Sequence, residues 1–122
     1  MTDEFHKLVR DEIPRIIEEN GERPIVHVAE GEAYERHLFE KFEEELGEFR
    51  TDRSLEELAD VLEVVHAICV YEGWSVAELE RRRQEKADER GRFEDGIVLE
   101  RVVSNGEAIE SDDNSPAKPD KK

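Results

Sequence analysis

Two short acidic patterns are the residues of this chain best suited to chemistry. They are Glu44-Glu45-Leu46-Gly47-Glu48 and Glu57-Leu58-Ala59-Asp60. In each pattern two carboxylates stand three residues apart, so a helix would place both on one face, one turn apart. Carboxylate oxygens are ligands of Mg²⁺ in sites that handle phosphates. If neighbouring helices bring the patterns together, they would form a magnesium site from Glu45, Glu48, Glu57 and Asp60.

Spacing alone is weak support, because the chain is rich in acid. Asp and Glu supply 34 of the 122 residues, and at that frequency roughly nine acidic pairs at i and i+3 arise by chance. Position on the helix is stronger support. At about 100° per residue from Tyr34, Glu45 falls at about 20°, inside the apolar stripe of the helix predicted here, and Glu48 lies beside it at about −40°. Glu43 points away at about 180°, which is not the pattern of a uniformly acidic surface.

The acidic patterns also have structural explanations. Ser54 and Glu57 form a capping-box pattern, in which the Glu57 carboxylate would bond back to the Ser54 amide. Glu45 and Glu48 could belong to a surface adapted to salt. Asp60 is harder to explain in this way, because a carboxylate in the second turn of a largely buried helix is costly unless it is paired or bound to a metal. These alternatives stay open on the sequence.

Four helices and two strands are predicted to position these residues. The predicted helices span residues 11–20, 31–50, 55–72 and 75–89, from hydrophobic periodicity and from start and stop residues. β-branched runs at 25–28 and 97–103 predict two short strands that pair with each other. We therefore expect a mainly α fold, a four-helix bundle with a small two-stranded β element.

The helix predicted over 55–72 is apolar nearly all round, which indicates that it is covered on more than one side. Its two opposite stripes are Leu55, Leu58, Leu62, Val65 and Cys69, and Val64, Ala67 and Tyr71. Glu57 and Asp60 flank the second stripe. A chain of this length has few helices to cover both stripes, so we expect an oligomer, either a homodimer or a homotetramer.

The charge balance limits the expected partners and location. A formal net charge of −16 argues against a nucleic-acid polymer or an anionic membrane as partner, and it suits a halophilic, salt-rich cytoplasm. No apolar stretch approaches the roughly 18 residues of a membrane span. We expect a cytoplasmic protein with one domain over 1–103 and a disordered, polar tail over 104–122.

The acidic patterns, together with residues near both ends, resemble a known family. Glu44-Glu45-x-x-Glu48 followed by Glu57-x-x-Asp60 resembles the paired motif of the MazG-like all-α nucleoside triphosphate pyrophosphohydrolases. Lys7-Leu8-Val9-Arg10-Asp11-Glu12-Ile13-Pro14 and Lys86-x-x-x-Arg90-Gly91-x-Phe93 resemble a subgroup often labelled phosphoribosyl-ATP pyrophosphohydrolase-like. The resemblance covers residues 5 to about 103.

The resemblance implies four helices that assemble through dimers, and Mg²⁺-dependent cleavage of a nucleotide substrate between its α- and β-phosphates. The products would be a monophosphate and pyrophosphate. Mg²⁺, with Mn²⁺ as a substitute, would be held by Glu45, Glu48, Glu57 and Asp60. Glu44 would hold a second metal or orient water. The leaving pyrophosphate would be neutralised by Lys7, Arg10, Lys86 and Arg90.

Two other functions stay open on the sequence. A catalytically idle helical protein could use the fold for assembly only. An enzyme of the same class could act on phosphoribosyl-ATP in histidine synthesis, which ranks lower because the chain lacks a basic surface for a large anionic ligand. Nothing in the sequence identifies the base of the nucleotide.

Overall fold

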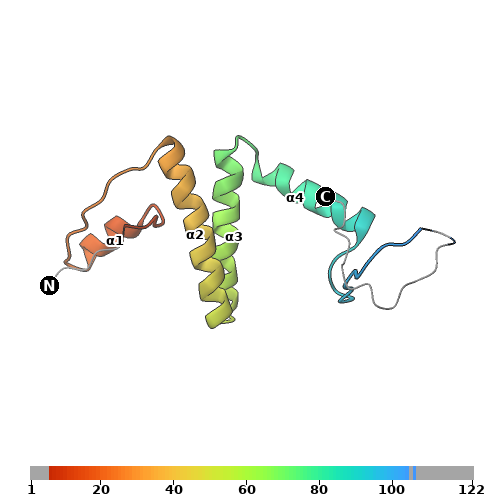
Figure 1. The fold of residues 1–122 in the computed structure, drawn as a ribbon. Coiled ribbons are helices and arrows are strands. Elements are labelled where there is room, and N and C mark those ends of the chain that lie inside the picture. The colour runs from red at the N-terminus through yellow and green to blue at the C-terminus, as the bar shows by residue number, and fades with distance from the viewer. Residues whose placement is uncertain (1–5, 105, 107–122) are drawn as a thin grey trace. The chain divides into compact units, whose positions relative to one another are not determined.

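The computed structural model describes residues 6–104 and residue 106. Four helices follow one another along this part of the chain (Figure 1). They are α1 (Ile13–Glu19), α2 (Gly31–Thr51), α3 (Leu55–Tyr71) and α4 (Val76–Arg90). The prediction of a mainly α fold with four helices is confirmed. α1 begins two residues later than predicted, and the other helix ends differ from prediction by at most one residue.

The chain divides into two compact units, residues 1–82 and 83–122, with the boundary inside α4. The first unit holds α1, α2, α3 and the start of α4. The second holds the rest of α4 and the described residues after that helix, and the tail predicted over 104–122 lies outside the described residues except for Ser104 and Gly106. Both acidic patterns belong to the first unit.

A short connection makes α2 and α3 a packed helical hairpin. Residues 52–54 link the two helices (Figure 1), and so short a link returns the chain alongside the helix it has left. The Ser54 hydroxyl begins α3 by accepting a hydrogen bond from the Glu57 amide at 3.2 Å, which satisfies one of the free amides of the first turn. The first turns of α3 therefore lie beside the last turns of α2.

The hydrophobic core of the described residues is small. Its buried side chains are Leu38 of α2 and Val64 and Cys69 of α3, with exposures of 1%, 7% and 3%. Val64 lies one turn after Asp60, so the second acidic pattern shares the packed face of α3. The Cys69 thiol donates to the Ser75 carbonyl at 3.3 Å, as expected of a buried structural cysteine.

One apolar stripe of α3 is largely exposed in the part of the chain that the structure describes. Leu55, Leu58 and Leu62 are 78%, 47% and 52% exposed, and helical spacing places all three on one side of α3. Val64 of the opposite stripe is buried. Among the described residues this stripe is thus less covered than the opposite one, and a covering second subunit stays a prediction.

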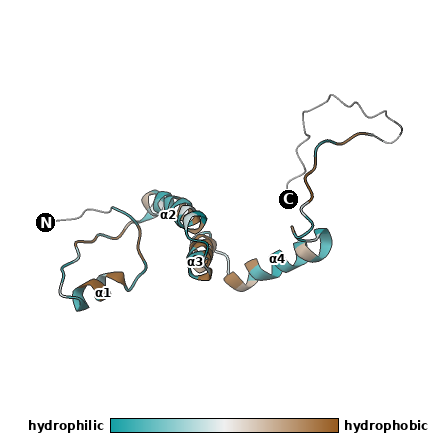
Figure 2. Cartoon of the chain, turned by 90° about the horizontal axis from the view of Figure 1, so that it is seen from below, coloured by the Kyte–Doolittle hydropathy of each residue, from teal (hydrophilic) through white to brown (hydrophobic). Residues whose placement is uncertain are grey.

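The predicted two-stranded β element is wrong for the part of the chain that the structure describes. Residues 25–28 and 97–103 are irregular there and form no strand. Their apolar side chains face solvent, with Ile25 81% and Ile97 84% exposed, and Figure 2 shows the hydrophobic character of 97–103. β-branched residues favour extended backbone, but a strand also needs a partner for its amides and carbonyls. The two runs belong to different units, and neither pairs as a strand with another described segment.

The described helices are too polar or too short to cross a membrane. α2 is the longest, with 21 residues, but charged side chains occur along its whole length. α4 is largely hydrophilic after its first residues (Figure 2).

Candidate metal centre

Three carboxylates from two helices converge where α2 and α3 pack together. Glu45 of α2 and Glu57 and Asp60 of α3 each offer one oxygen, and the three oxygens lie within 4.8 Å of one another. Glu45 is buried, 7% exposed, and the other two are half-buried. The spacing on α3 puts Glu57 and Asp60 one turn apart on the side that meets Glu45. The structure thus brings together three of the four predicted metal ligands, here called the carboxylate triad.

Glu48, the fourth predicted ligand, is not part of the carboxylate triad. It lies one turn after Glu45 on α2 and its side chain is exposed. Its charge nevertheless reaches the site. Burial raises the pKa of Glu57, and the negative charges of Glu48 and Asp60 raise it further. Without a cation, the site therefore resists the ionisation of Glu57.

Glu57 has a buried oxygen that no described group satisfies. Its Oε1 atom is buried, and within residues 6–104 no donor forms a hydrogen bond with it. The capping-box alternative fails for this carboxylate, because the Ser54 amide donates to the Asp52 carbonyl at 2.8 Å. Of the two hydrogen bonds of a capping box, only the one from the Glu57 amide to the Ser54 hydroxyl forms. An unpaired buried carboxylate oxygen is costly, and a bound cation would satisfy it.

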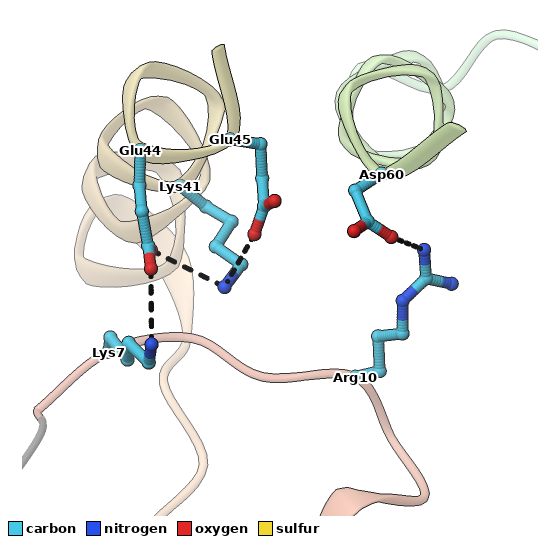
Figure 3. Close-up of polar contacts among 6 residues, drawn as sticks. All are labelled: Lys7, Arg10, Lys41, Glu44, Glu45 and Asp60. Carbon is cyan, nitrogen blue, oxygen red and sulfur yellow. Dashed lines mark hydrogen bonds and ion pairs between the residues drawn. The ribbon is translucent and has the colours of Figure 1, made fainter. Parts of the chain in front are cut away.

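Two lysines neutralise the α2 side of the site (Figure 3). The Lys41 ammonium lies 3.0 Å from Glu45 Oε2 and 3.4 Å from Glu44 Oε1. The Lys7 ammonium lies 3.1 Å from Glu44 Oε2. Burial opposes the charge on Lys41, but the hydrogen bond to Glu45 and the charges of Glu44 and Glu45 outweigh it and raise the pKa of Lys41. Lys41 is therefore a fixed positive charge beside the triad.

An arginine neutralises the α3 side. The Arg10 guanidinium donates to Asp60 Oδ1 at 2.7 Å. Figure 3 shows that Lys7 and Arg10 stand on one backbone segment, which crosses from the carboxylate of Glu44 to that of Asp60. The side chains of Lys7 and Arg10 are 43% and 55% exposed, so both ion pairs are open to water.

Glu44, the predicted catalytic residue, lies beside the triad. Its two oxygens accept hydrogen bonds from Lys7 and Lys41, at 3.1 and 3.4 Å. Burial opposes the charge, but the hydrogen bond from Lys7 and the positive charge of Lys41 outweigh it and lower the pKa of Glu44. Glu44 is therefore ionised at neutral pH. A carboxylate in this state can orient a water molecule or help to hold a cation.

Lys41 is the residue of this site that the sequence analysis missed. The signal was present, because Lys41 stands three and four residues before Glu44 and Glu45, the spacing at which side chains meet on a helix. The remaining predicted phosphate ligands, Lys86 and Arg90, are exposed on α4 in the second unit. The structure describes them within that unit and not in relation to the triad.

The carboxylate triad can hold a metal ion. Its ligands are oxygens, which hard divalent cations prefer, and it includes no thiolate or imidazole that would favour a softer metal. The unsatisfied Oε1 atom of Glu57 supplies a buried acceptor at the same place. The residues therefore fit a hard divalent cation.

Comparisons of the chain with protein-family models, with curated proteins and with solved structures found no match. The likeness to the MazG-like pyrophosphohydrolases therefore rests on the residue patterns of the chain itself.

Proposed function

We propose that this protein is a Mg²⁺-dependent nucleotide pyrophosphohydrolase. It would cleave a nucleoside triphosphate, or a related nucleotide, between the α- and β-phosphates and release a monophosphate and pyrophosphate. The observation that carries the proposal is the convergence of Glu45, Glu57 and Asp60, with a buried oxygen of Glu57 that no described residue satisfies. The resemblance of both acidic patterns to the MazG-like motif supplies the reaction class.

The residues of the site have different roles in the proposed reaction. Glu45, Glu57 and Asp60 hold the cation, and ionised Glu44 accepts a hydrogen bond from the attacking water and orients it. Mg²⁺, when bound, supplies charge screening between carboxylates and phosphates and makes its bound water more acidic. Positive side chains bind the oxygens of the leaving pyrophosphate, and in the first unit this role is assigned to Lys7 and Arg10.

Glu48 is assigned as the fourth ligand from the sequence pattern. It lies one turn along α2 from Glu45, and its negative charge acts on Glu57. Its side chain is exposed, so a change of rotamer meets little steric resistance. Mn²⁺ can substitute for Mg²⁺ in an all-oxygen set of this kind.

A helical assembly protein without activity is the second candidate function. The exposed leucines of α3, Leu55, Leu58 and Leu62, favour it, because they offer a surface for association without any chemistry. This candidate predicts an oligomer that neither turns over nucleotides nor gains stability from Mg²⁺. Measurements of metal binding and of nucleotide turnover therefore distinguish the two candidate functions.

A screen of nucleotides tests the proposed reaction. The full chain, in concentrated salt, is incubated with single nucleoside triphosphates and with phosphoribosyl-ATP, with and without Mg²⁺. Inorganic pyrophosphatase is added to convert released pyrophosphate into detectable phosphate. We expect a signal that requires both Mg²⁺ and pyrophosphatase, with a monophosphate as the other product. Phosphate release without pyrophosphatase, together with a diphosphate product, would contradict the proposal.

Asp60→Asn tests the metal centre within that assay. The substitution keeps the shape of the side chain but removes one ligand charge, so we expect turnover to be lost while the helix content measured by circular dichroism is kept. Glu43→Gln is the control, because Glu43 is an exposed carboxylate of α2 next to the acidic pattern and its substitution removes the same charge. An equal loss of activity in both variants would mean a general effect of charge and would count against the site.

A further inference from the structure

Positive side chains are scarce in this chain, yet three of them meet at the metal centre. Lys and Arg supply 18 residues against 34 of Asp and Glu. Lys7, Arg10 and Lys41 all bind carboxylates of the two acidic patterns. Two of these three, Lys7 and Arg10, come from one short segment that bridges Glu44 and Asp60 (Figure 3). Residues 7–10 are here called the strap.

We propose that the strap is an internal counter-ion that a divalent cation displaces. Without the cation, Arg10 neutralises Asp60 and holds the strap against α3. When the triad binds a cation, Arg10 leaves Asp60 and becomes available to a phosphate oxygen of the ligand. This inference rests on the proposed metal centre and adds an order of binding, with the cation first and the phosphate second.

Competition at Asp60 follows from the geometry. Asp60 is a member of the triad, and the Arg10 guanidinium already occupies its Oδ1 at 2.7 Å. A cation on the triad takes up the negative charge of Asp60 and repels the guanidinium. The two positive groups therefore cannot both hold Asp60 at full strength.

The three positive side chains differ in exposure, which indicates which of them can leave their carboxylates. The Arg10 side chain is 55% exposed and that of Lys7 is 43% exposed, whereas that of Lys41 is 16% exposed. Exposed ion pairs contribute little net stability, so water and competing ions replace them easily. Lys41 also contacts Glu45 of the triad, but Glu44 gives it a second carboxylate of its own helix, so it keeps a partner when a cation binds. Exchange is therefore expected at the strap.

The released groups suit phosphate. A guanidinium offers a planar fork of donors that matches two oxygens of a phosphate, and an ammonium adds a point charge. In a chain with a net charge of −16, a polyanionic ligand meets repulsion until positive groups face it. A strap that turns toward phosphate only after cation binding would therefore favour a nucleotide only when the triad already holds the cation.

Mn²⁺ affinity, measured by electron paramagnetic resonance without nucleotide, tests the competition. Arg10→Gln removes the competitor, so we expect Mn²⁺ to bind about twofold to fivefold more tightly, the range that corresponds to the coupling of an exposed ion pair. Arg15→Gln is the matched control, because Arg15 loses the same charge but pairs with Glu12 and Glu19 outside the triad. Its Mn²⁺ affinity should equal that of the wild type.

Amide hydrogen exchange over residues 7–13 gives a second readout that does not depend on activity. The Ile13 amide donates to the Arg10 carbonyl at 3.1 Å, so this turn reports on the end of the strap. We expect faster exchange when Mn²⁺ is added to the wild type, and slower exchange again when pyrophosphate is then added. Arg10→Gln should show fast exchange from the start.

The outcomes separate the strap from the metal centre. If the wild type binds Mn²⁺ but Arg10→Gln binds it equally or more weakly, the strap proposal is overturned and the metal centre stands. If added Mn²⁺ does not change the rate of amide exchange over residues 7–13, the strap proposal is likewise overturned. If the wild type binds no Mn²⁺, the metal centre fails and the strap proposal fails with it.

Discussion

Glu57 shows at the scale of one residue how a binding site opposes stability. Its Oε1 atom is buried and receives no hydrogen bond from the described residues, and burial together with the charges of Glu48 and Asp60 raises its pKa. Because the pKa is higher in the folded state, ionised Glu57 destabilises the metal-free fold. That penalty is absent below the pKa of the unfolded chain and is complete above the folded pKa. A cation on the triad removes the cause of the penalty.

Glu57→Gln should therefore stabilise the metal-free protein and remove its response to metal. At neutral pH with a chelator, we expect a higher melting temperature than that of the wild type, because the variant carries no charge to bury. The difference should shrink as the pH falls through the folded pKa of Glu57, where the wild type becomes neutral too. Added Mg²⁺ should raise the melting temperature of the wild type but not that of Glu57→Gln. Calorimetry at several pH values measures all three effects.

Glu43→Gln is again the control, with its exposed carboxylate. It should leave the melting temperature of the metal-free protein nearly unchanged and keep the response to Mg²⁺. A Glu57→Gln variant that melts below the wild type at neutral pH without metal would contradict this account of the site.

The sequence could identify those site residues whose relative positions are set by the geometry of a single helix. Glu45 was placed by its angle within the apolar stripe of α2, and Lys41 could have been found from its spacing to Glu44 and Glu45. The contacts of Lys7 and Arg10 could not be found in this way, because they join residues 37 and 50 positions apart. Helical periodicity carries no information about such distant pairs.

At the scale of elements, the N-cap residue Ser54 sets where α3 begins. Ser54 caps the helix one turn before Glu57, so the cap also fixes the start of the second acidic pattern. Local signals of this kind, caps and apolar periodicity, are why the four helices could be predicted. The predicted strands failed because a strand needs a partner distant in sequence, and β-branched composition does not specify one.

Ser54→Ala should weaken both the fold and the metal centre. Loss of a helix-capping hydroxyl costs about 1 kcal/mol of the free energy of unfolding, which urea denaturation measures. Fraying of the first turn of α3 would loosen Glu57 and Asp60, so we also expect weaker Mn²⁺ binding. Ser75→Ala is the matched control, because Ser75 accepts a hydrogen bond from the Glu78 amide at 3.0 Å in the same way at the start of α4. It should cost similar stability and leave Mn²⁺ binding intact, and equal weakening of binding by both variants would contradict a role for the Ser54 cap.

At the scale of the whole molecule, charge and apolar surface act against each other. A net charge of −16 makes copies of the chain repel one another at low salt, whereas concentrated salt shortens the range of that repulsion to about 3 Å at 1 M. The exposed leucines of α3 favour association under the same conditions. Salt should therefore decide whether copies of the chain can associate through this surface.

We expect the chain to form a homodimer or homotetramer in concentrated salt through the stripe of Leu55, Leu58 and Leu62. Leu62→Glu places a charge within that stripe, where burial in an interface would be costly, so sedimentation should show a shift toward the 14.2 kDa single chain. Because Leu62 is 52% exposed within its own chain, the helix content should stay unchanged.

Ile25→Glu is the control, since Ile25 is an apolar residue that is 81% exposed outside the helices. The assembly of the Ile25→Glu variant should match that of the wild type. A wild type that sediments only as a single chain in concentrated salt would contradict the prediction, because the stripe would then be exposed without a partner.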